Sequence, residues 1–104
     1  MDPTVTAGWW YVTPVYYIKY DWSGTWKLKS YIDDNRTLIA GLICNFLPNT
    51  VARTTCQAIF LLVRTDIINT VNAAIANKKC YKVRMPASGG AISLPAYDSY
   101  YVTC

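Results

Sequence analysis

The sequence contains no histidine and no glutamate, so all six of its acidic side chains are aspartates. Histidine is the side chain best suited to proton transfer near neutral pH and is a common metal ligand, so its absence argues against most catalytic and zinc sites. Asp33-Asp34 is the only adjacent acidic pair, and we interpret it as helix capping rather than as a catalytic acid and base. The glycines match no phosphate-binding loop. We therefore expect a protein that is not an enzyme and that uses no metal and no cofactor.

Long apolar runs are also missing. A membrane-spanning helix needs about 18 to 20 predominantly apolar residues. The longest candidates, 38–47 and 58–63, are shorter, and Arg64 and Asp66 end the second one. Residues 1–3 lack the basic and apolar regions of a signal peptide. We expect a domain that does not span a membrane and, if the protein is exported, its mature form.

Four cysteines are present in 104 residues, without a C-x-x-C motif. An even number of scattered cysteines in a short chain is typical of disulfides in an oxidising compartment, so we expect a secreted, extracellular protein. Four cysteines allow three pairings. Cys44 and Cys56 lie on the two sides of a Pro-Asn turn and can face each other across a helical hairpin. We therefore favour Cys44 with Cys56 and Cys80 with Cys104.

The first third of the chain is rich in aromatic and β-branched residues. The segments 9–20 and 25–32 are separated by a turn cluster, which predicts a β-hairpin. A three-residue loop with Gly24 in the left-handed conformation would place Ile18 opposite Leu28. A two-residue loop would mix apolar and charged side chains on each face, so we prefer the longer loop.

The middle of the chain follows helical periodicity. Residues 33–35 can cap a first helix in which Leu38, Leu42 and Phe46 are four residues apart, and Pro48 ends it. A second, longer helix begins at residue 49 or 50. Its apolar stripe is wide, which indicates either burial between two layers or a half-exposed face for a partner. We favour burial; the stripe consists of Ala52, Cys56, Ile59, Phe60, Val63, Ile67, Val71, Ala74 and Ile75.

Shorter β-like segments follow the second helix. Residues 80–85 alternate as a strand, 91–94 resemble a short strand, and 97–104 resemble a last one. The element order predicts one domain, 1–104, of α+β class. In this fold an antiparallel sheet, made of the N-terminal hairpin and the C-terminal strands, packs on a disulfide-linked helical hairpin.

Nine tyrosines and four tryptophans are more than a core of this size absorbs. Adjacent strand residues point to opposite faces, so one ring of each adjacent pair leaves the core. Such rings suit protein interfaces, carbohydrate stacking and membrane surfaces, although cross-strand aromatic pairs are the simpler explanation. Lysines near a helix C-terminus are likewise favoured by the helix dipole alone. The predicted binding surface comprises Trp9, Trp10, Tyr11, Tyr16, Tyr17, Trp22, Lys78, Lys79, Lys82 and Arg84.

The sequence TLIAGLICNFLPNTVARTTCQAI, followed by NKKCYKVRMP, resembles small exported proteins of Gram-positive bacteria that are described as bacteriocin-like or remain uncharacterised. The resemblance lies in the predicted aromatic hairpin, the cysteines around the proline turn and the short strand after the second helix, and covers roughly residues 26–86. It implies a secreted factor that acts on other cells or in a complex with secreted subunits. It supplies no site residues.

Three functions fit these features. The first is a secreted, non-enzymatic toxin or antimicrobial protein that binds a cell-envelope component through aromatic and basic surface. The second is an adaptor or structural subunit of a secreted complex that pairs through an aromatic edge strand. The third is an inhibitor of a secreted hydrolase, for which 85–90 is the candidate loop. A protein or envelope partner and peripheral membrane contact agree with a net charge of +4, whereas export and disulfides argue against nucleic acid.

Overall fold

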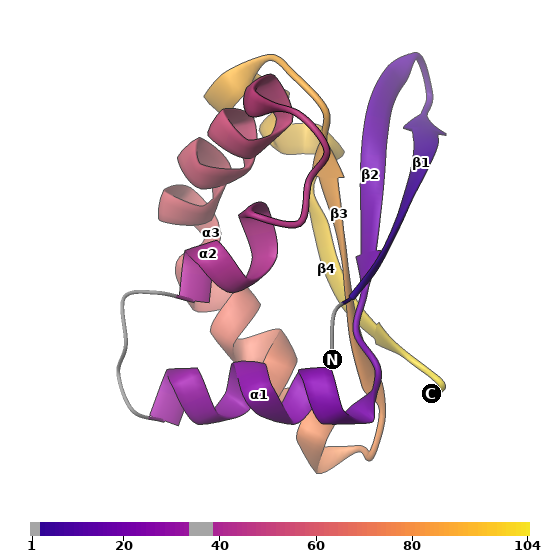
Figure 1. The fold of residues 1–104 in the computed structure, drawn as a ribbon, viewed down its shortest axis with the longest axis vertical. Helices are drawn as coiled ribbons and strands as arrows, with labels where there is room; N and C mark the ends of the chain where they lie inside the picture. The colour runs from indigo at the N-terminus through magenta and orange to yellow at the C-terminus, as the bar shows by residue number, and fades with distance from the viewer. Residues whose placement is uncertain (1–2, 34–38) are drawn as a thin grey trace.

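A computed structural model describes residues 3–33 and 39–104. The four strands form one antiparallel sheet in the order β1-β2-β3-β4, and the α-helices pack on one of its faces (Figure 1). The predicted α+β class is therefore confirmed. The elements are β1 (Thr4–Trp10), β2 (Thr13–Lys19), α1 (Trp22–Asp33), α2 (Ile39–Cys44), α3 (Thr50–Ala76), β3 (Cys80–Pro86), the 3-10 helix η1 (Gly90–Ala96) and β4 (Asp98–Val102).

The N-terminal hairpin is formed by β1 and β2, which are joined through Tyr11 and Val12. Tyr11 lies in the left-handed region with φ 54°, as a tight hairpin turn requires. Ile18 is opposite Val5 on one side and Val83 on the other. The predicted hairpin between segments 9–20 and 25–32 is therefore wrong, because the second segment is helical.

Local capping explains why 25–32 is a helix despite its β-like composition. The Asp21 carboxylate accepts a hydrogen bond from the Gly24 backbone N–H (2.6 Å), and the Asp21 carbonyl accepts one from the Thr25 N–H (2.9 Å). This is the geometry of a helix N-terminus. Gly24, Thr25 and Leu28 are buried, at spacings that put them on one side of α1. Capping and burial thus outweigh β propensity here.

The predicted helical hairpin is present as α2 and α3. The Asn49 side chain caps α3 by accepting a hydrogen bond from the Ala52 N–H (2.8 Å). Cys44 and Cys56 form a disulfide with their Cα atoms 5.6 Å apart, which confirms the favoured pairing. The first helix ends at Cys44, earlier than predicted. Of its proposed caps, Asp33 is the last residue of α1, and 34–35 lie outside the described residues.

Helix α3 supplies the centre of the core. Its buried residues follow the predicted stripe closely, although Val63 has a non-helical φ of −118° that marks a kink. Within the described ranges, α3 is the one helix long and apolar enough to cross a bilayer. It packs on α1, α2 and the sheet, and 28% of its most apolar stretch is buried. Leu61 and Leu62 lie on its exposed side.

The C-terminal part contains one difference from prediction. Residues 91–94 belong to the 3-10 helix η1 rather than to a strand. Gly89 precedes η1 in the left-handed conformation (φ 98°), and Pro95 within it lacks the N–H that a strand ladder would use. The predicted strands at 80–85 and 97–104 are present as β3 and β4. The second favoured disulfide, Cys80 with Cys104, is also confirmed.

Candidate functional site

One face of the sheet carries no α-helix in the described structure (Figure 1). Residues directly opposite each other in an antiparallel pair share a face. Ile18 and Val83 are opposite each other and belong to the core cluster, so they define the helix-covered face. Their neighbours Tyr17 and Arg84 therefore project to the opposite side, which we call the outer face.

The outer face carries alternating rings and cations. The Lys82 Nζ atom lies 5.1 Å from the centroid of the Tyr17 ring, and the Arg84 Cζ atom lies 5.3 Å from the centroid of the Trp10 ring. Both distances fall within cation–π range. Tyr100 is opposite Lys82 on β4. We call this set, Trp10, Tyr17, Lys82, Arg84 and Tyr100, the outer-face ladder.

Backbone contacts and the neighbouring strands fix the positions of the ladder side chains. The Arg84 Nε–H donates to the carbonyl of Ala96 (2.7 Å), which orients the guanidinium. Burial, with smaller contributions from the nearby Tyr17 and Asp98, raises the pKa of the Tyr100 hydroxyl. Lys82 and Arg84 therefore supply the positive charge of the ladder, and Asp98, directly opposite Arg84, places one carboxylate beside it.

Lys19 and Lys82 are directly opposite each other on β2 and β3. Like charges in this position destabilise a sheet pair. In the described part of the chain the only salt bridge is Lys29 with Asp33, so neither Lys19 nor Lys82 has a carboxylate partner there. A bound anion would remove this repulsion, which makes the lysine pair the most distinctive electrostatic feature of the outer face.

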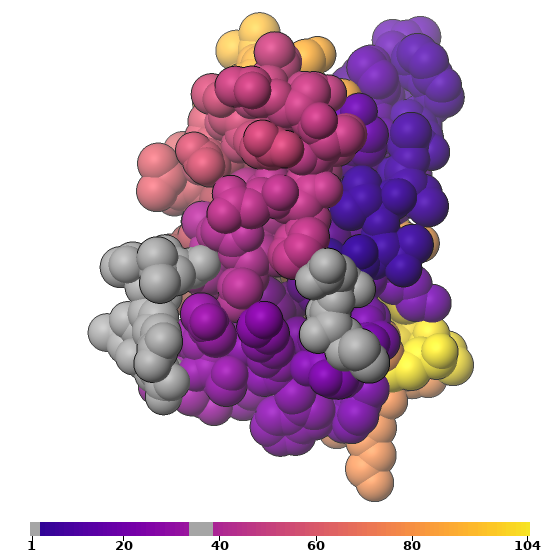
Figure 2. Space-filling view, viewed as in Figure 1, coloured from indigo at the N-terminus to yellow at the C-terminus, as the bar shows by residue number. Residues whose placement is uncertain are grey.

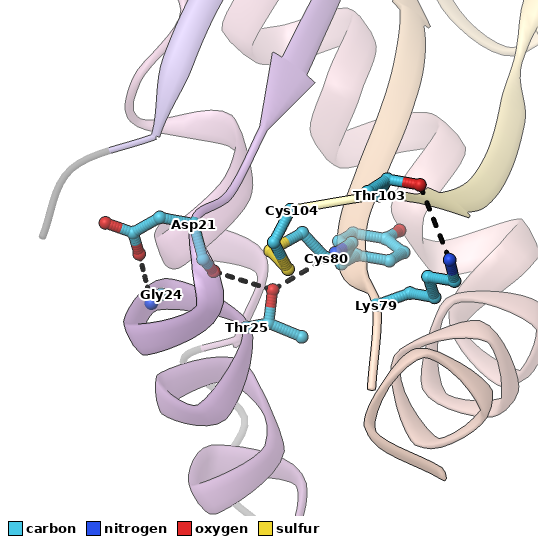
Figure 3. The surroundings of a disulfide bond; sticks show 8 residues. Asp21, Gly24, Thr25, Lys79, Cys80, Thr103 and Cys104 are labelled. Atoms are coloured by element: carbon cyan, nitrogen blue, oxygen red, sulfur yellow. Dashed lines mark hydrogen bonds between the residues drawn. A yellow bond between two sulfur atoms is a disulfide. The ribbon is translucent and has the colours of Figure 1, made fainter. Parts of the chain in front are cut away.

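The C-terminal disulfide positions the strands that carry Lys82 and Tyr100 (Figure 3). Cys80 and Cys104 join the start of β3 to the end of the chain with their Cα atoms 5.1 Å apart. Nearby, the Thr25 hydroxyl donates to the Asp21 carbonyl (2.8 Å) and accepts from the Tyr81 N–H (3.1 Å), which ties α1 to β3. Covalent and hydrogen-bonded links therefore hold this end of the sheet.

The residues predicted as one binding surface fall into separate groups. Trp10, Tyr17, Lys82 and Arg84 come together on the outer face. The other six lie elsewhere. Trp9 and Tyr11 are exposed at the hairpin end, Tyr16 is half-buried against the core, Trp22 packs edge-on against Trp26 of α1, and Lys78 and Lys79 occupy the connection between α3 and β3.

Lys19 and Tyr100 belong to the outer face but were not among the predicted surface residues. Strand alternation places Lys19 on the same face as Tyr17, so that signal was available in the sequence. The position of Tyr100 opposite Lys82 depends on the pairing of β3 with β4 across η1. Sequence alternation alone does not define that register.

The outer face also carries one acidic side chain. Asp98 is opposite Arg84 and is the acidic residue of β4. No group of three or more Cys or Asp side chains that could hold a metal ion occurs in the ranges 3–33 and 39–104. Comparison with protein-family models, curated proteins and solved structures finds no match to this chain, so its own geometry must support any functional assignment.

Proposed function

We propose that this chain is a secreted toxin or antimicrobial-type protein without enzymatic activity, and that it binds an anionic polymer of the cell envelope through its outer face. The two disulfides are compatible with an extracellular protein. The observation that carries the proposal is the outer-face ladder next to the unneutralised pair Lys19 and Lys82.

The chemistry of the face fits a negatively charged carbohydrate. The ring faces of Tyr17 and Tyr100 offer apolar surface to sugar C–H groups, and the hydroxyls remain as polar handles. Lys19, Lys82 and Arg84 attract phosphate or carboxylate groups along a chain. A sheet face without a covering helix leaves room for an extended polymer rather than a single small molecule.

The test is titration of the disulfide-intact protein with polygalacturonate, an anionic sugar polymer, and with uncharged dextran. We expect binding to polygalacturonate that weakens as salt increases. The double variant Lys19→Gln/Lys82→Gln should weaken binding about 30-fold, at about 1 kcal/mol per lysine near an anionic surface. Tyr100→Thr retains strand propensity while removing the ring, and should weaken binding about fivefold.

The matched control is Lys27→Gln/Lys29→Gln, which removes the same net charge from α1. It breaks only an exposed ion pair with Asp33, which contributes little to stability. If this control weakens binding as much as the sheet variant does, net charge rather than the outer face is responsible. Growth inhibition of Gram-positive cells should follow the same order of variants, and absence of both binding and inhibition in the wild type refutes the proposal.

A second candidate function, an adaptor in a secreted complex, is favoured by β4. This strand pairs only with β3 among the described residues, and Tyr101 on it is 41% exposed. A groove lined by residues of α3 and β4, including Thr70 and Tyr100, runs beside it. A partner strand could therefore extend the sheet at this edge. Solution mass and capture of partners from culture supernatant test this, and a strict monomer without a partner contradicts it.

A further inference from the structure

The two ends of the molecule differ sharply in charge. All six lysines lie in or next to α1, the end of β2, the α3–β3 connection and the start of β3, which occupy the lower part of Figure 1. The upper end contains the β1–β2 turn, the start of α3 and η1. The corresponding segments, 9–14, 49–55 and 87–96, contain a single charged residue, Arg53. We call these three segments the uncharged end.

Contacts between the segments make the uncharged end one surface. The Gly90 N–H donates to the Thr55 hydroxyl (3.3 Å), and the Ala87 N–H donates to the Pro14 carbonyl (3.0 Å). A groove lined by Trp10 and Ile92, among others, separates the hairpin from η1. In Figure 2 the hairpin and η1 both project at the top of the molecule.

The uncharged end exposes large apolar side chains. Of the ten exposed large hydrophobic residues in the described structure, five lie here, and the other five are spread over α1, α3 and β4. Val12 is 89% and Ile92 90% exposed, so neither contributes appreciably to the core. Exposed large apolar side chains gathered at one end of a molecule indicate an interaction surface. The five residues are Trp9, Tyr11, Val12, Val51 and Ile92.

We propose that the uncharged end inserts shallowly into the interfacial region of a lipid bilayer. The Tyr11–Val12 turn and Ile92 are the inserted groups. Tryptophan and tyrosine favour this region because each has an apolar body and a polar group, and the aliphatic side chains reach beyond it. The lysines at the opposite end remain in water.

A lipid surface fits this end better than the alternatives. The described uncharged end contains no carboxylate that insertion would have to dehydrate. Three of its five exposed groups, Tyr11, Val12 and Ile92, belong to a hairpin turn and a 3-10 helix, two separate projections that a deformable surface can cover together (Figure 2). Its low charge offers little to an anionic polymer. The proposal concerns a different partner, and its inserted groups, Tyr11, Val12 and Ile92, lie outside the outer-face ladder; Trp10, which Arg84 contacts, borders both surfaces. It does not depend on the proposed function.

The experiment is co-sedimentation of the disulfide-intact protein with phosphatidylcholine vesicles, whose lipids carry no net charge. We expect binding that changes by less than about twofold between low and high salt, because the contact is apolar. Val12→Asp/Ile92→Asp should weaken binding at least about tenfold, since two inserted apolar groups become charged. Quenching of tryptophan fluorescence by brominated lipids should be lost in parallel.

Leu61→Asp/Leu62→Asp is the matched control. It places the same two charges on exposed leucines of α3, away from the uncharged end, and should alter vesicle binding by less than about twofold. Both double variants change solvent-exposed side chains, so near-ultraviolet circular dichroism and the urea midpoint should stay close to wild type. Val12→Asp/Ile92→Asp should also retain polygalacturonate binding, which separates this proposal from the proposed function.

Several results would overturn the proposal. The wild type could fail to bind phosphatidylcholine vesicles, or its binding could fall steeply with salt and depend on Lys19 and Lys82. Equal loss in the Leu61→Asp/Leu62→Asp control would place the contact on α3. A concentration-dependent dimer that only Val12→Asp/Ile92→Asp abolishes would identify a second copy of the chain as the occupant.

Discussion

Replacement of Thr25 by valine tests how α1 is joined to the sheet. The Thr25 side chain is completely buried, and its hydroxyl is the acceptor for the Tyr81 N–H. The backbone N–H and C=O of a strand residue point to the same side, and the Tyr81 carbonyl accepts from the Tyr20 N–H. β2 ends at Lys19, so no further residue of that strand offers a carbonyl to the Tyr81 N–H. The Thr25 hydroxyl takes the place of this missing acceptor.

The expected loss can be worked out from these contacts. Valine has nearly the shape of threonine, so Thr25→Val removes the hydroxyl without opening a cavity and leaves the Tyr81 N–H buried without an acceptor. An unsatisfied buried group costs about 1–3 kcal/mol, so we expect the free energy of unfolding to fall by about 2 kcal/mol. The substitution also removes the hydrogen bond from the Thr25 hydroxyl to the Asp21 carbonyl. That carbonyl still accepts from the backbone N–H of residue 25 (2.9 Å), so this second loss adds little to the cost.

Thr25→Ser is the informative comparison. It retains the hydroxyl and removes one buried methyl group, which costs about 1 kcal/mol. The hydrogen-bond argument therefore predicts that the valine variant is less stable than the serine variant, whereas hydrophobicity alone predicts the reverse. Urea unfolding at neutral pH with both disulfides intact measures the difference. A valine variant as stable as the serine variant would refute the proposed role of Thr25.

The remaining predictions concern cross-links, packing and pH. Alanine at both cysteines of the 44–56 disulfide should cost about 3 kcal/mol, and the same change at 80–104 slightly more because its loop is longer, as urea unfolding will show. Ile67→Ala should cost about 2–5 kcal/mol, whereas Leu61→Ala, at an 80% exposed position, should change the unfolding free energy by less than about 0.5 kcal/mol. Equal losses of stability in Ile67→Ala and Leu61→Ala would contradict the burial assigned to these two residues. Burial raises the pKa of the Tyr81 hydroxyl well above its ordinary value of 10.0, so the unfolded chain loses this proton first. The unfolding free energy should therefore fall as pH rises beyond about 10, which rapid pH-jump absorbance at the tyrosinate band can follow.

Several features of the fold were predictable because they depend on local sequence. The Asn49 cap and the apolar period of α3 are encoded within a few residues. The disulfide pairing followed from the helical hairpin, because a short turn brings Cys44 and Cys56 together and leaves Cys80 for Cys104. These inferences required no long-range register.

The segment 25–32 shows where local pattern was insufficient. Its aromatic and β-branched residues favour a strand, yet the Asp21 cap and the burial of Leu28 against the core make it a helix. β propensity largely reflects the surroundings of a residue, so a composition typical of strands does not define a strand. The hairpin partner of β2 was instead β1, which begins at Thr4.

The sequence by itself determined the α+β class, the two cross-links and the excess of rings and cations, because composition and short-range periodicity specify these. Only the tertiary structure decided which rings meet which cations. Lys19 faces Lys82, and Tyr100 lies beside them, through strand pairings between segments more than 15 residues apart. The separation of the lysines from the uncharged end likewise results from how the strands and helices run along the molecule. Such neighbours depend on the register of packed elements, which short-range pattern does not encode.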